Sequence, residues 1–228
     1  MCIIVIFGLP GSGKTTCIQE LLKEKSKLPF DILSRNDFED WAGKQSKLKK
    51  IIIILKNAGA YFIILMPYLK IALRNSASGV DFWKRIALSP IYFIYMRHFL
   101  KSRNQIYLSD HGSVQELWSI LVRSNSIPDR YIQNVIDTWK KQFCFRYIYF
   151  RTHPSVVAKR LLYRKSGQSL FDGKSLAQMK DDLVNAHECY ERLVDIMKIS
   201  GINIHYIKNE SELNTSVSDL RKFILQEA

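Results

Sequence analysis

The sequence has few cysteines, and their spacing is not that of a metal site or a disulfide framework. There is no C-x-x-C pair and no histidine at metal-ligand spacing, and the cysteines are scattered along the chain: Cys2, Cys17, Cys144 and Cys189. Zinc modules and disulfide-stabilised domains carry regularly spaced cysteines. We therefore interpret these residues as small buried side chains in a reducing environment.

Signals for secretion and for a membrane span are also lacking. Residues 1–7 have no basic start and no small-residue cleavage site, both of which are typical of a secretory signal. The most apolar stretch, 51–73, is interrupted by polar residues and by Pro67, and so falls short of the roughly 18 apolar residues of a spanning helix. We expect a cytoplasmic protein in which this stretch forms a buried helix pair. An interfacial helix beside anionic lipid is the alternative.

Acidic residues are scarce in the middle of the chain. Between Trp41 and Ser109 there are twelve basic residues and a single acidic one, Asp81, so most of the net charge of +13 belongs to this segment. Such a concentration predicts an anionic partner, either a phosphorylated small molecule, an anionic membrane surface or nucleic acid. Nucleic acid has no clear support in the sequence. A solubilising face without a specific ligand is the other interpretation.

The rest of the sequence alternates apolar runs with amphipathic segments. The runs predicted to form strands are 3–7, 30–33, 105–109, 145–150 and 202–207. The segments predicted to form helices are 14–25, most of 44–75 and 82–103, 115–123, 129–140, 155–165, 175–199 and 217–226. Thr215 or Ser216 is the expected cap of the last helix. This alternation predicts one α/β domain, 1–228, with a mostly parallel sheet between helices.

One motif carries strong chemical information. The run Gly8-Leu-Pro-Gly-Ser-Gly-Lys-Thr15 matches G-x-x-x-x-G-K-[ST] between a predicted strand and a predicted helix. Its glycines let backbone N–H groups face a phosphate, which the positive end of the helix also favours. Lys14 is expected to reach the β- and γ-phosphates of a nucleotide, and the Thr15 hydroxyl to bind Mg²⁺. The candidate nucleotide-binding residues of the loop are Gly8, Gly11, Ser12, Gly13, Lys14, Thr15 and Thr16.

Two further groups of residues complement this loop. Asp110 follows the strand 105–109, which would bring its carboxylate to the edge of the sheet where it can bind Mg²⁺ or orient an acceptor hydroxyl. Capping of the next helix is the alternative role. Arg160 and Arg164 share one face of a predicted helix that leads into a glycine-containing loop. We expect 160–175 to be a lid whose arginines are catalytic, because they would stabilise charge on a transferring phosphoryl group; a solvated helix face is the alternative.

These features resemble the nucleoside and nucleotide kinase group of P-loop proteins, and its thymidylate-kinase-like members in particular. The similarity rests on three segments in the same order: the loop at 8–15, Tyr107-Leu-Ser-Asp-His-Gly112, and His153-Pro-Ser-Val-Val-Ala-Lys-Arg-Leu-Leu-Tyr-Arg164. The resemblance implies a P-loop NTPase three-layer sandwich with a lid, and the use of ATP and Mg²⁺. It also implies that the stretch around Lys208 and Asn209 packs on adenine.

The chain departs from thymidylate kinases on the acceptor side. It has Asp110-His111 where those enzymes have Asp-Arg, and it lacks the acidic residue that they commonly carry between the loop glycines. The segment 41–105, a helical basic insertion in the acceptor region, has no counterpart that we can place. We interpret the chain as an ATP- and Mg²⁺-dependent phosphotransferase with an unidentified, anionic small-molecule acceptor. The oligomeric state stays open, a dimer included.

The alternative function is an ATP-dependent switch or assembly factor that binds an anionic partner or a membrane surface through the basic segment. The chain has neither the Asn/Thr-Lys-x-Asp motif of GTPase switches nor the signature of ABC transporters. These absences make the switch less favoured than the phosphotransferase.

Overall fold

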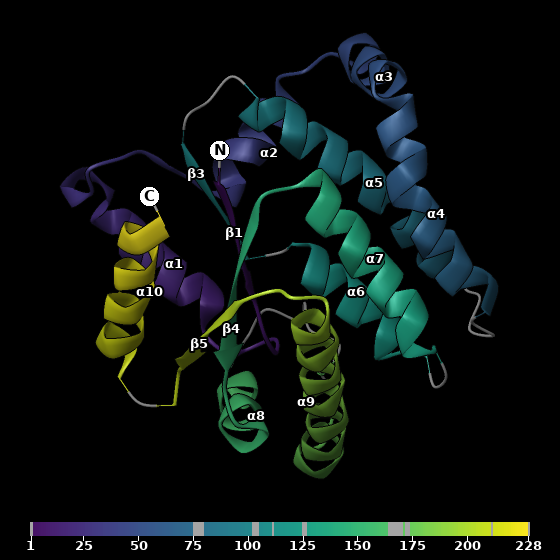
Figure 1. The fold of residues 1–228 in the computed structure, drawn as a ribbon. Helices are drawn as coiled ribbons and strands as arrows, with labels where there is room; N and C mark the ends of the chain where they lie inside the picture. Colours follow the sequence, from purple (N-terminus) through teal and green to yellow (C-terminus); the bar gives the residue numbers. More distant parts are fainter. Residues whose placement is uncertain are drawn as a thin grey trace.

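A parallel β-sheet forms the centre of the computed structural model, which describes residues 2–74, 80–101, 105–110, 112–124, 127–163, 171, 174–210 and 212–227 (Figure 1). Its strands are β1 (Cys2–Phe7), β2 (Ile32–Leu33), β3 (Ile106–Ser109), β4 (Phe145–Arg151) and β5 (Ile204–Lys208). They lie in the order β2-β3-β1-β4-β5, and each neighbouring pair is parallel. The central strand β1 therefore has β3 on one side and β4 on the other.

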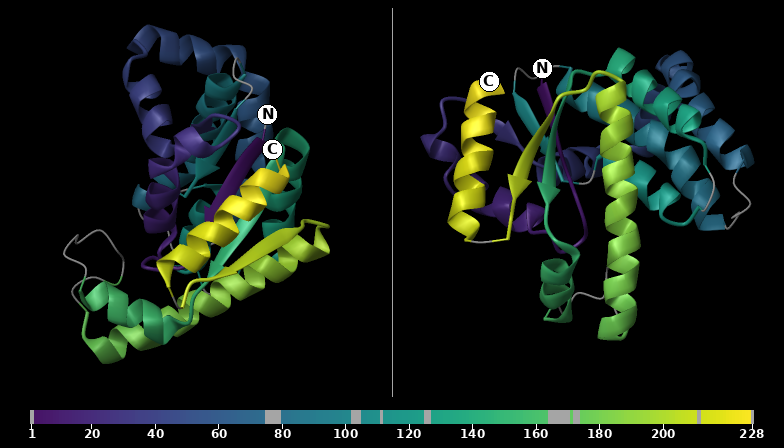
Figure 2. Two further views of the ribbon diagram at one scale, coloured as in Figure 1. Left: turned by 90° about the vertical axis from the view of Figure 1, so that its left-hand side faces the viewer. Right: turned by 60° about the horizontal axis from the view of Figure 1, so that its bottom comes forward.

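Helices cover both faces of the sheet, and this explains why the strands are so apolar. The helices are α1 (Lys14–Lys23), α2 (Arg35–Gly43), α3 (Lys47–Lys56), α4 (Ala58–Arg74), α5 (Val80–Leu100), α6 (Ser113–Leu121), α7 (Asp129–Gln142), α8 (Pro154–Leu162), α9 (Leu176–Ile199) and α10 (Leu213–Glu227), with a short 3₁₀ helix at Lys25–Lys27. Ile4 and Ile6 of β1 share a core with α1 and α10, whereas Val5 and Phe7 share the larger core with α2 and with helices α4 to α9. Figure 2 shows α1 and α10 on one side of the sheet and α9 on the other. The predicted three-layer α/β fold is confirmed.

The basic middle segment folds as helices, as predicted, but its helix pair is only half buried. The inner side chains Ile53 of α3 and Ile64 and Tyr68 of α4 are buried. The outer side chains, such as Leu55 and Phe62, are exposed. The expectation of a buried helix pair therefore holds for the inner faces and is wrong for the outer ones, because hydropathy alone does not distinguish a helix with two packed faces from one with a single packed face.

Several boundaries differ from the sequence predictions. Helix α10 begins at Leu213 rather than at 217, so Thr215 and Ser216, the two expected caps, both lie within the helix, where Ser216 is buried. Helix α8 ends at Leu162 instead of 165. Arg164 and most of the expected lid, 164–170 and 172–173, lie outside the described residues. Among the cysteines, Cys17 is buried, Cys189 is half-buried and Cys144 is exposed, so the prediction of buried side chains is confirmed for Cys17 and wrong for Cys144.

Helix α2 was not predicted, although its first turn is strongly specified. Ser34 and Asp37 form a capping box, in which the backbone N–H of Ser34 donates to Asp37 Oδ2 at 2.7 Å. This arrangement satisfies N–H groups that an isolated helix start would leave unpaired. The box places the next residue, Arg35, at the first position of the helix, directly beyond the end of β2.

Candidate functional site

The loop between β1 and α1 depends on glycine at each of its turns. Gly8, Gly11 and Gly13 have φ angles of 146°, 84° and 93°, which other residues rarely adopt. A Cβ atom on Gly8 would lie 2.5 Å from the carbonyl oxygen of Phe150, and one on Gly13 would lie 2.2 Å from Asn209 Nδ2. Both the backbone conformation and the close approach of neighbouring segments therefore require glycine.

The N-terminus of α1 is suited to bind an anion. The helix begins at Lys14, and no hydrogen bond from the side chains of the described residues caps it. The first N–H groups of the helix and its dipole favour negative charge at this point. Lys14 Nζ lies within the loop, where it donates to the carbonyl oxygens of Gly8 at 2.8 Å and Leu9 at 2.9 Å and to Ser12 Oγ at 3.2 Å. An ammonium group, backbone amides and a glycine turn are together the donor set that nucleotide phosphates need, so the loop fits this ligand.

Thr15 and Asp110 meet at the carboxyl edge of the sheet. Thr15 Oγ1 donates to Asp110 Oδ2 at 2.8 Å across 95 residues of sequence. The contact follows from the sheet register, because Val5 of β1 lies opposite Ser109 of β3 and both strands end close together. Gly112, and not Asp110, occupies the N-cap of α6, so the alternative role as a helix cap is wrong. A hydroxyl and a carboxylate in contact supply two of the oxygen ligands that Mg²⁺ accepts.

The carbonyl oxygen of Ser12 fastens the loop to the C-terminal half of the chain. It accepts hydrogen bonds from Asn209 Nδ2 at 2.7 Å, from Arg160 Nη1 at 3.3 Å and from Thr152 Oγ1 at 3.4 Å. Arg160 Nη2 also donates to the carbonyl oxygen of Asn209 at 2.9 Å, and Asn209 Oδ1 accepts from Ser216 Oγ at 3.0 Å. The described contacts of Arg160 are thus with the backbone that holds the loop in place.

The other residues predicted for the site lie less close to the loop centre. Thr16 is exposed on α1, and Lys208 is exposed at the end of β5. Arg164, predicted as a second lid arginine, and His111, which follows Asp110, lie outside the described residues. The structure therefore brings together Lys14, Thr15, Asp110, Arg160 and Asn209, and leaves the lid prediction untested.

Sequence reasoning missed Arg35, whose positive charge lies near Asp110. Burial alone would lower the pKa of Arg35, but the hydrogen bond to Glu39, at 2.6 Å, and the negative charges of Glu39 and Asp110 raise it instead. Tyr92 of α5 also reaches this edge, where its hydroxyl lies 3.4 Å from that of Tyr107. The capping box after a short strand is the sequence signal that could have identified the position. The positive charge of Arg35 therefore lies near Asp110, the residue that the sequence follows with His111 instead of an arginine.

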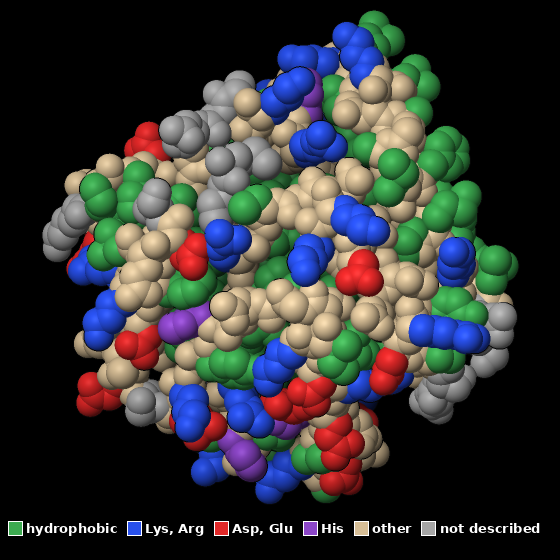
Figure 3. Space-filling model, viewed as in Figure 1, with side chains coloured by type: hydrophobic (Ala, Val, Ile, Leu, Met, Phe, Trp, Pro, Cys, Tyr) green, Lys and Arg blue, Asp and Glu red, His purple; other side chains and the backbone are tan. Residues whose placement is uncertain are grey.

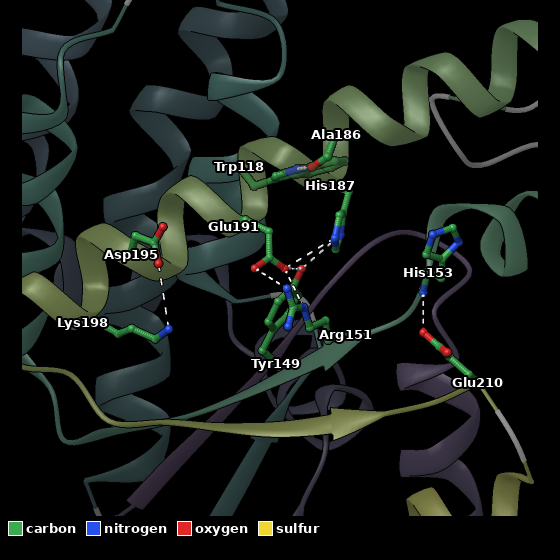
Figure 4. Close-up of polar contacts among 10 residues, drawn as sticks. All are labelled: Trp118, Tyr149, Arg151, His153, Ala186, His187, Glu191, Asp195, Lys198 and Glu210. Carbon is green, nitrogen blue, oxygen red and sulfur yellow. Dashed lines mark hydrogen bonds and ion pairs between the residues drawn. The ribbon is translucent and has the colours of Figure 1, made fainter.

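A second polar cluster fastens α9 to β4. Glu191 accepts two hydrogen bonds from Arg151, both at 3.0 Å, and one from the Tyr149 hydroxyl at 3.1 Å (Figure 4). His187 Nε2 lies 3.5 Å from the same carboxylate. Burial lowers the pKa of His187, and the positive charge of Arg151 lowers it further against the opposing effect of Glu191. The cluster therefore holds α9 against β4. Its histidine, His187, favours the neutral form.

The fold and the loop are those of P-loop proteins, and comparison with solved structures agrees at the level of the fold. One similar structure is a shikimate kinase from Bacteroides thetaiotaomicron, with 13% identity and a TM-score of 0.51, covering 98% of this chain and 98% of that chain. Another is a deoxyadenosine kinase from M. mycoides, with 15% identity and a TM-score of 0.51, covering 97% and 98%. A third is a thymidylate kinase from Candida albicans, with 13% identity and a TM-score of 0.54, covering 99% and 91%. The chain has the fold of P-loop kinases.

Sequence comparisons add one local match. The family model of the viral superfamily 1 RNA helicase core domain matches residues 4–53, which contain the P-loop. No curated protein matches the sequence. The helicase match is to a P-loop protein and covers less than a quarter of the chain. The predicted resemblance to P-loop kinases is confirmed by the structural matches at the level of the fold.

Proposed function

We propose that this protein is an ATP- and Mg²⁺-dependent phosphotransferase of the nucleoside and nucleotide kinase type. The observation that carries the proposal is the 2.8 Å contact between Thr15 and Asp110 beside Lys14 at the start of α1. It gathers an ammonium group, a hydroxyl and a carboxylate at the edge of the sheet. Phosphoryl transfer relies on such pre-positioned charges, because the protein has little covalent chemistry to perform.

The candidate nucleotide-binding residues of the loop have defined tasks in this proposal. The backbone N–H groups of the glycine turn, with Ser12 and Thr16, bind the phosphates. Lys14 exchanges the carbonyl oxygens of Gly8 and Leu9 for phosphate oxygens and stabilises the charge of the transferring group. Mg²⁺, when bound with the nucleotide, would be held by Thr15 and Asp110 and would neutralise phosphate charge.

The remaining predicted residues have supporting tasks in this proposal. Arg160 holds the loop through the Ser12 carbonyl and, with Arg164, stabilises charge during transfer. Lys208, the last residue of β5, and Asn209, which follows it, would lie on the side of the nucleotide base. Asn209 is already in contact with the loop.

Arg35 and Tyr92 define the acceptor side of the proposed site. Arg35 lies near Asp110, so an acceptor anion paired with this guanidinium would have its hydroxyl close to the Asp110 carboxylate. The carboxylate can then orient the hydroxyl or accept its proton. We therefore propose a small acceptor that carries a hydroxyl group together with a phosphate or carboxylate group.

The test is ATP consumption by the purified protein with Mg²⁺, alone and with a panel of nucleosides, nucleoside monophosphates, sugars and hydroxy acids. We expect one class to stimulate turnover, and Lys14→Ala to lower the stimulated rate by about a hundredfold or more. Lys23→Ala is the matched control, because Lys23 is exposed on the same helix and pairs only with Glu20 in the described structure. Equal rates for the Lys14 variant and the wild type would refute the mechanism. Slow hydrolysis that no acceptor stimulates would favour the ATP-dependent switch.

A further inference from the structure

The outer faces of α3 and α4 carry an exposed apolar surface, which we call the α3–α4 surface. Its main side chains are Leu48, Ile51, Leu55, Phe62, Ile63 and Met66. They recur at intervals of three and four residues, which places them along one stripe of each helix. Figure 3 shows hydrophobic side chains along the edge of the molecule that α3 and α4 form. More than half of the exposed large hydrophobic side chains among the described residues lie on α3, α4 and α5.

The exposed side chains of the α3–α4 surface are not the ones that attach the two helices to the protein core. The opposite sides of the two helices are already packed, with Ile53, Ile64, Tyr68 and Ile71 buried. The outer side chains are strongly exposed, 68% for Leu55 and 55% for Phe62. Scattered single hydrophobic residues are normal on a protein surface, but a contiguous apolar patch marks an interaction site.

The charge around the surface is of one sign. Lys47, Lys49, Lys56 and Lys70 are exposed on the same two helices, and none of them forms an ion pair within the described part of the chain. The sequence has no acidic residue at all between positions 41 and 80. A second copy of this chain would bring lysine against lysine, and a nucleic acid would leave the hydrophobic stripe uncovered. Anionic lipid headgroups above an acyl layer match both parts of the pattern.

The geometry suits a helix pair that lies on a bilayer. No single described helix is long and apolar enough to cross a membrane, and the pair α3 and α4 passes that test only together, with a bend of 78° between its helices. Two helix axes that meet at a bend lie in a common plane, so both can rest in one membrane interface. Their inner faces meanwhile stay packed on the protein core.

We propose that the α3–α4 surface docks the protein onto an anionic lipid bilayer, with its hydrophobic side chains in the interface and its lysines at the headgroups. This proposal is independent of the phosphotransferase activity, since none of these residues belongs to the proposed active site. In this proposal the excess positive charge of the middle segment serves to bind anionic lipid headgroups.

The test is flotation of the full chain with phosphatidylcholine vesicles, with and without phosphatidylserine, at physiological ionic strength. We expect binding only to the anionic vesicles, and release at high salt. The double variant Leu55→Asp with Lys56→Gln should lower the partition coefficient at least about tenfold, because it removes an apolar group that would insert into the interface and a headgroup contact. The matched control is Lys198→Gln with Ile199→Asp, which also replaces a lysine and an exposed aliphatic residue, at the end of α9, where Ile199 is 74% exposed.

Three results would overturn the proposal: no binding to anionic vesicles, equal binding to neutral ones, or an equal loss in both double variants. Thermal melting and ATP turnover in the absence of vesicles check that the variants are folded. Sedimentation velocity supplies a further outcome. If the wild type forms a dimer that the Leu55 variant dissociates, while neither protein floats, the surface is an interface between two copies and the lipid proposal is wrong.

Discussion

Asn209 offers a sharp test of how the P-loop is held, because its side chain links two buried groups. Nδ2 donates to the Ser12 carbonyl at 2.7 Å, and Oδ1 accepts from the Ser216 hydroxyl at 3.0 Å. Asn209 is 3% exposed and Ser216 1% exposed, so water does not readily replace either partner. The substitution Asn209→Ala removes both hydrogen bonds and leaves the Ser216 hydroxyl without its acceptor.

The size of the stability loss depends on whether each of the two former partners of Asn209 keeps another hydrogen bond. The Ser12 carbonyl keeps donors in Arg160 and Thr152, so its lost bond costs only about 1 kcal/mol. The orphaned Ser216 hydroxyl adds about 1–3 kcal/mol of desolvation penalty. Asn209→Ala should therefore lower the free energy of unfolding by about 2–4 kcal/mol. Ser216→Ala alone should cost about 1–2 kcal/mol, because it removes the donor to Asn209 Oδ1.

The double variant makes the reasoning testable. Once Asn209 is absent, Ser216→Ala replaces an unsatisfied hydroxyl with a methyl group and should cost nothing or restore stability. Urea unfolding monitored by circular dichroism would then show the double variant to be more stable than the sum of the single costs predicts, by about 1–3 kcal/mol. Additive costs within about 0.5 kcal/mol would refute the argument. They would mean that Ser216 finds another acceptor, such as a carbonyl of its own helix.

Three further predictions concern the site and its surroundings. Arg160→Ala should lower kcat about tenfold or more while the KM for ATP changes less, since the guanidinium charge is needed in the transition state. Weaker ATP binding at a normal kcat would mean that Arg160 only supports the loop. Arg35→Ala should raise the KM for the acceptor roughly tenfold or more and spare that for ATP, because a charge-assisted hydrogen bond is lost; an equal effect on both substrates in steady-state kinetics would contradict the assignment. His187 has a lowered pKa in the folded state, so below its ordinary value of 6.5 the unfolded chain binds a proton that the folded chain does not. Stability should therefore fall as the pH drops from about 6.5 toward the folded pKa, and His187→Gln should reduce this loss in urea unfolding at pH 7 and pH 5; an unchanged pH dependence would show that other groups control it.

The P-loop could be predicted from the sequence because its information is local. Glycine is needed where φ is positive, and Lys14 and Thr15 follow at fixed spacing on the first turn of a helix. Backbone conformation and helix geometry then determine where these side chains point, whatever the rest of the chain does. The alternation of strands and helices is likewise a matter of short-range hydrophobic periodicity, and it predicted the α/β class correctly.

Contacts between segments that are distant in the sequence could be predicted only in part. The sequence placed Asp110 at the end of a strand, but its contact with Thr15 depends on β3 lying beside β1. The positive charge of Arg35 lies near Asp110 because β2 is the neighbour of β3 in the sheet, and a two-residue strand followed by an unpredicted helix gave little indication of this in the sequence. Asn209 was assigned to a nucleotide base by resemblance, and its contact with the Ser12 carbonyl appears only in the tertiary structure.

By itself the sequence determined the phosphate-binding loop, the α/β class and the concentration of basic charge in the middle segment. The tertiary structure decided which carboxylate and which guanidinium surround the loop, and which face of the apolar helices stays exposed. The physical reason is that local preferences act over a few residues, whereas strand order and helix packing bring together groups that are separated by whole secondary-structure elements. Hydropathy records how apolar α3 and α4 are, but only packing shows that Leu55 and Phe62 point away from the core.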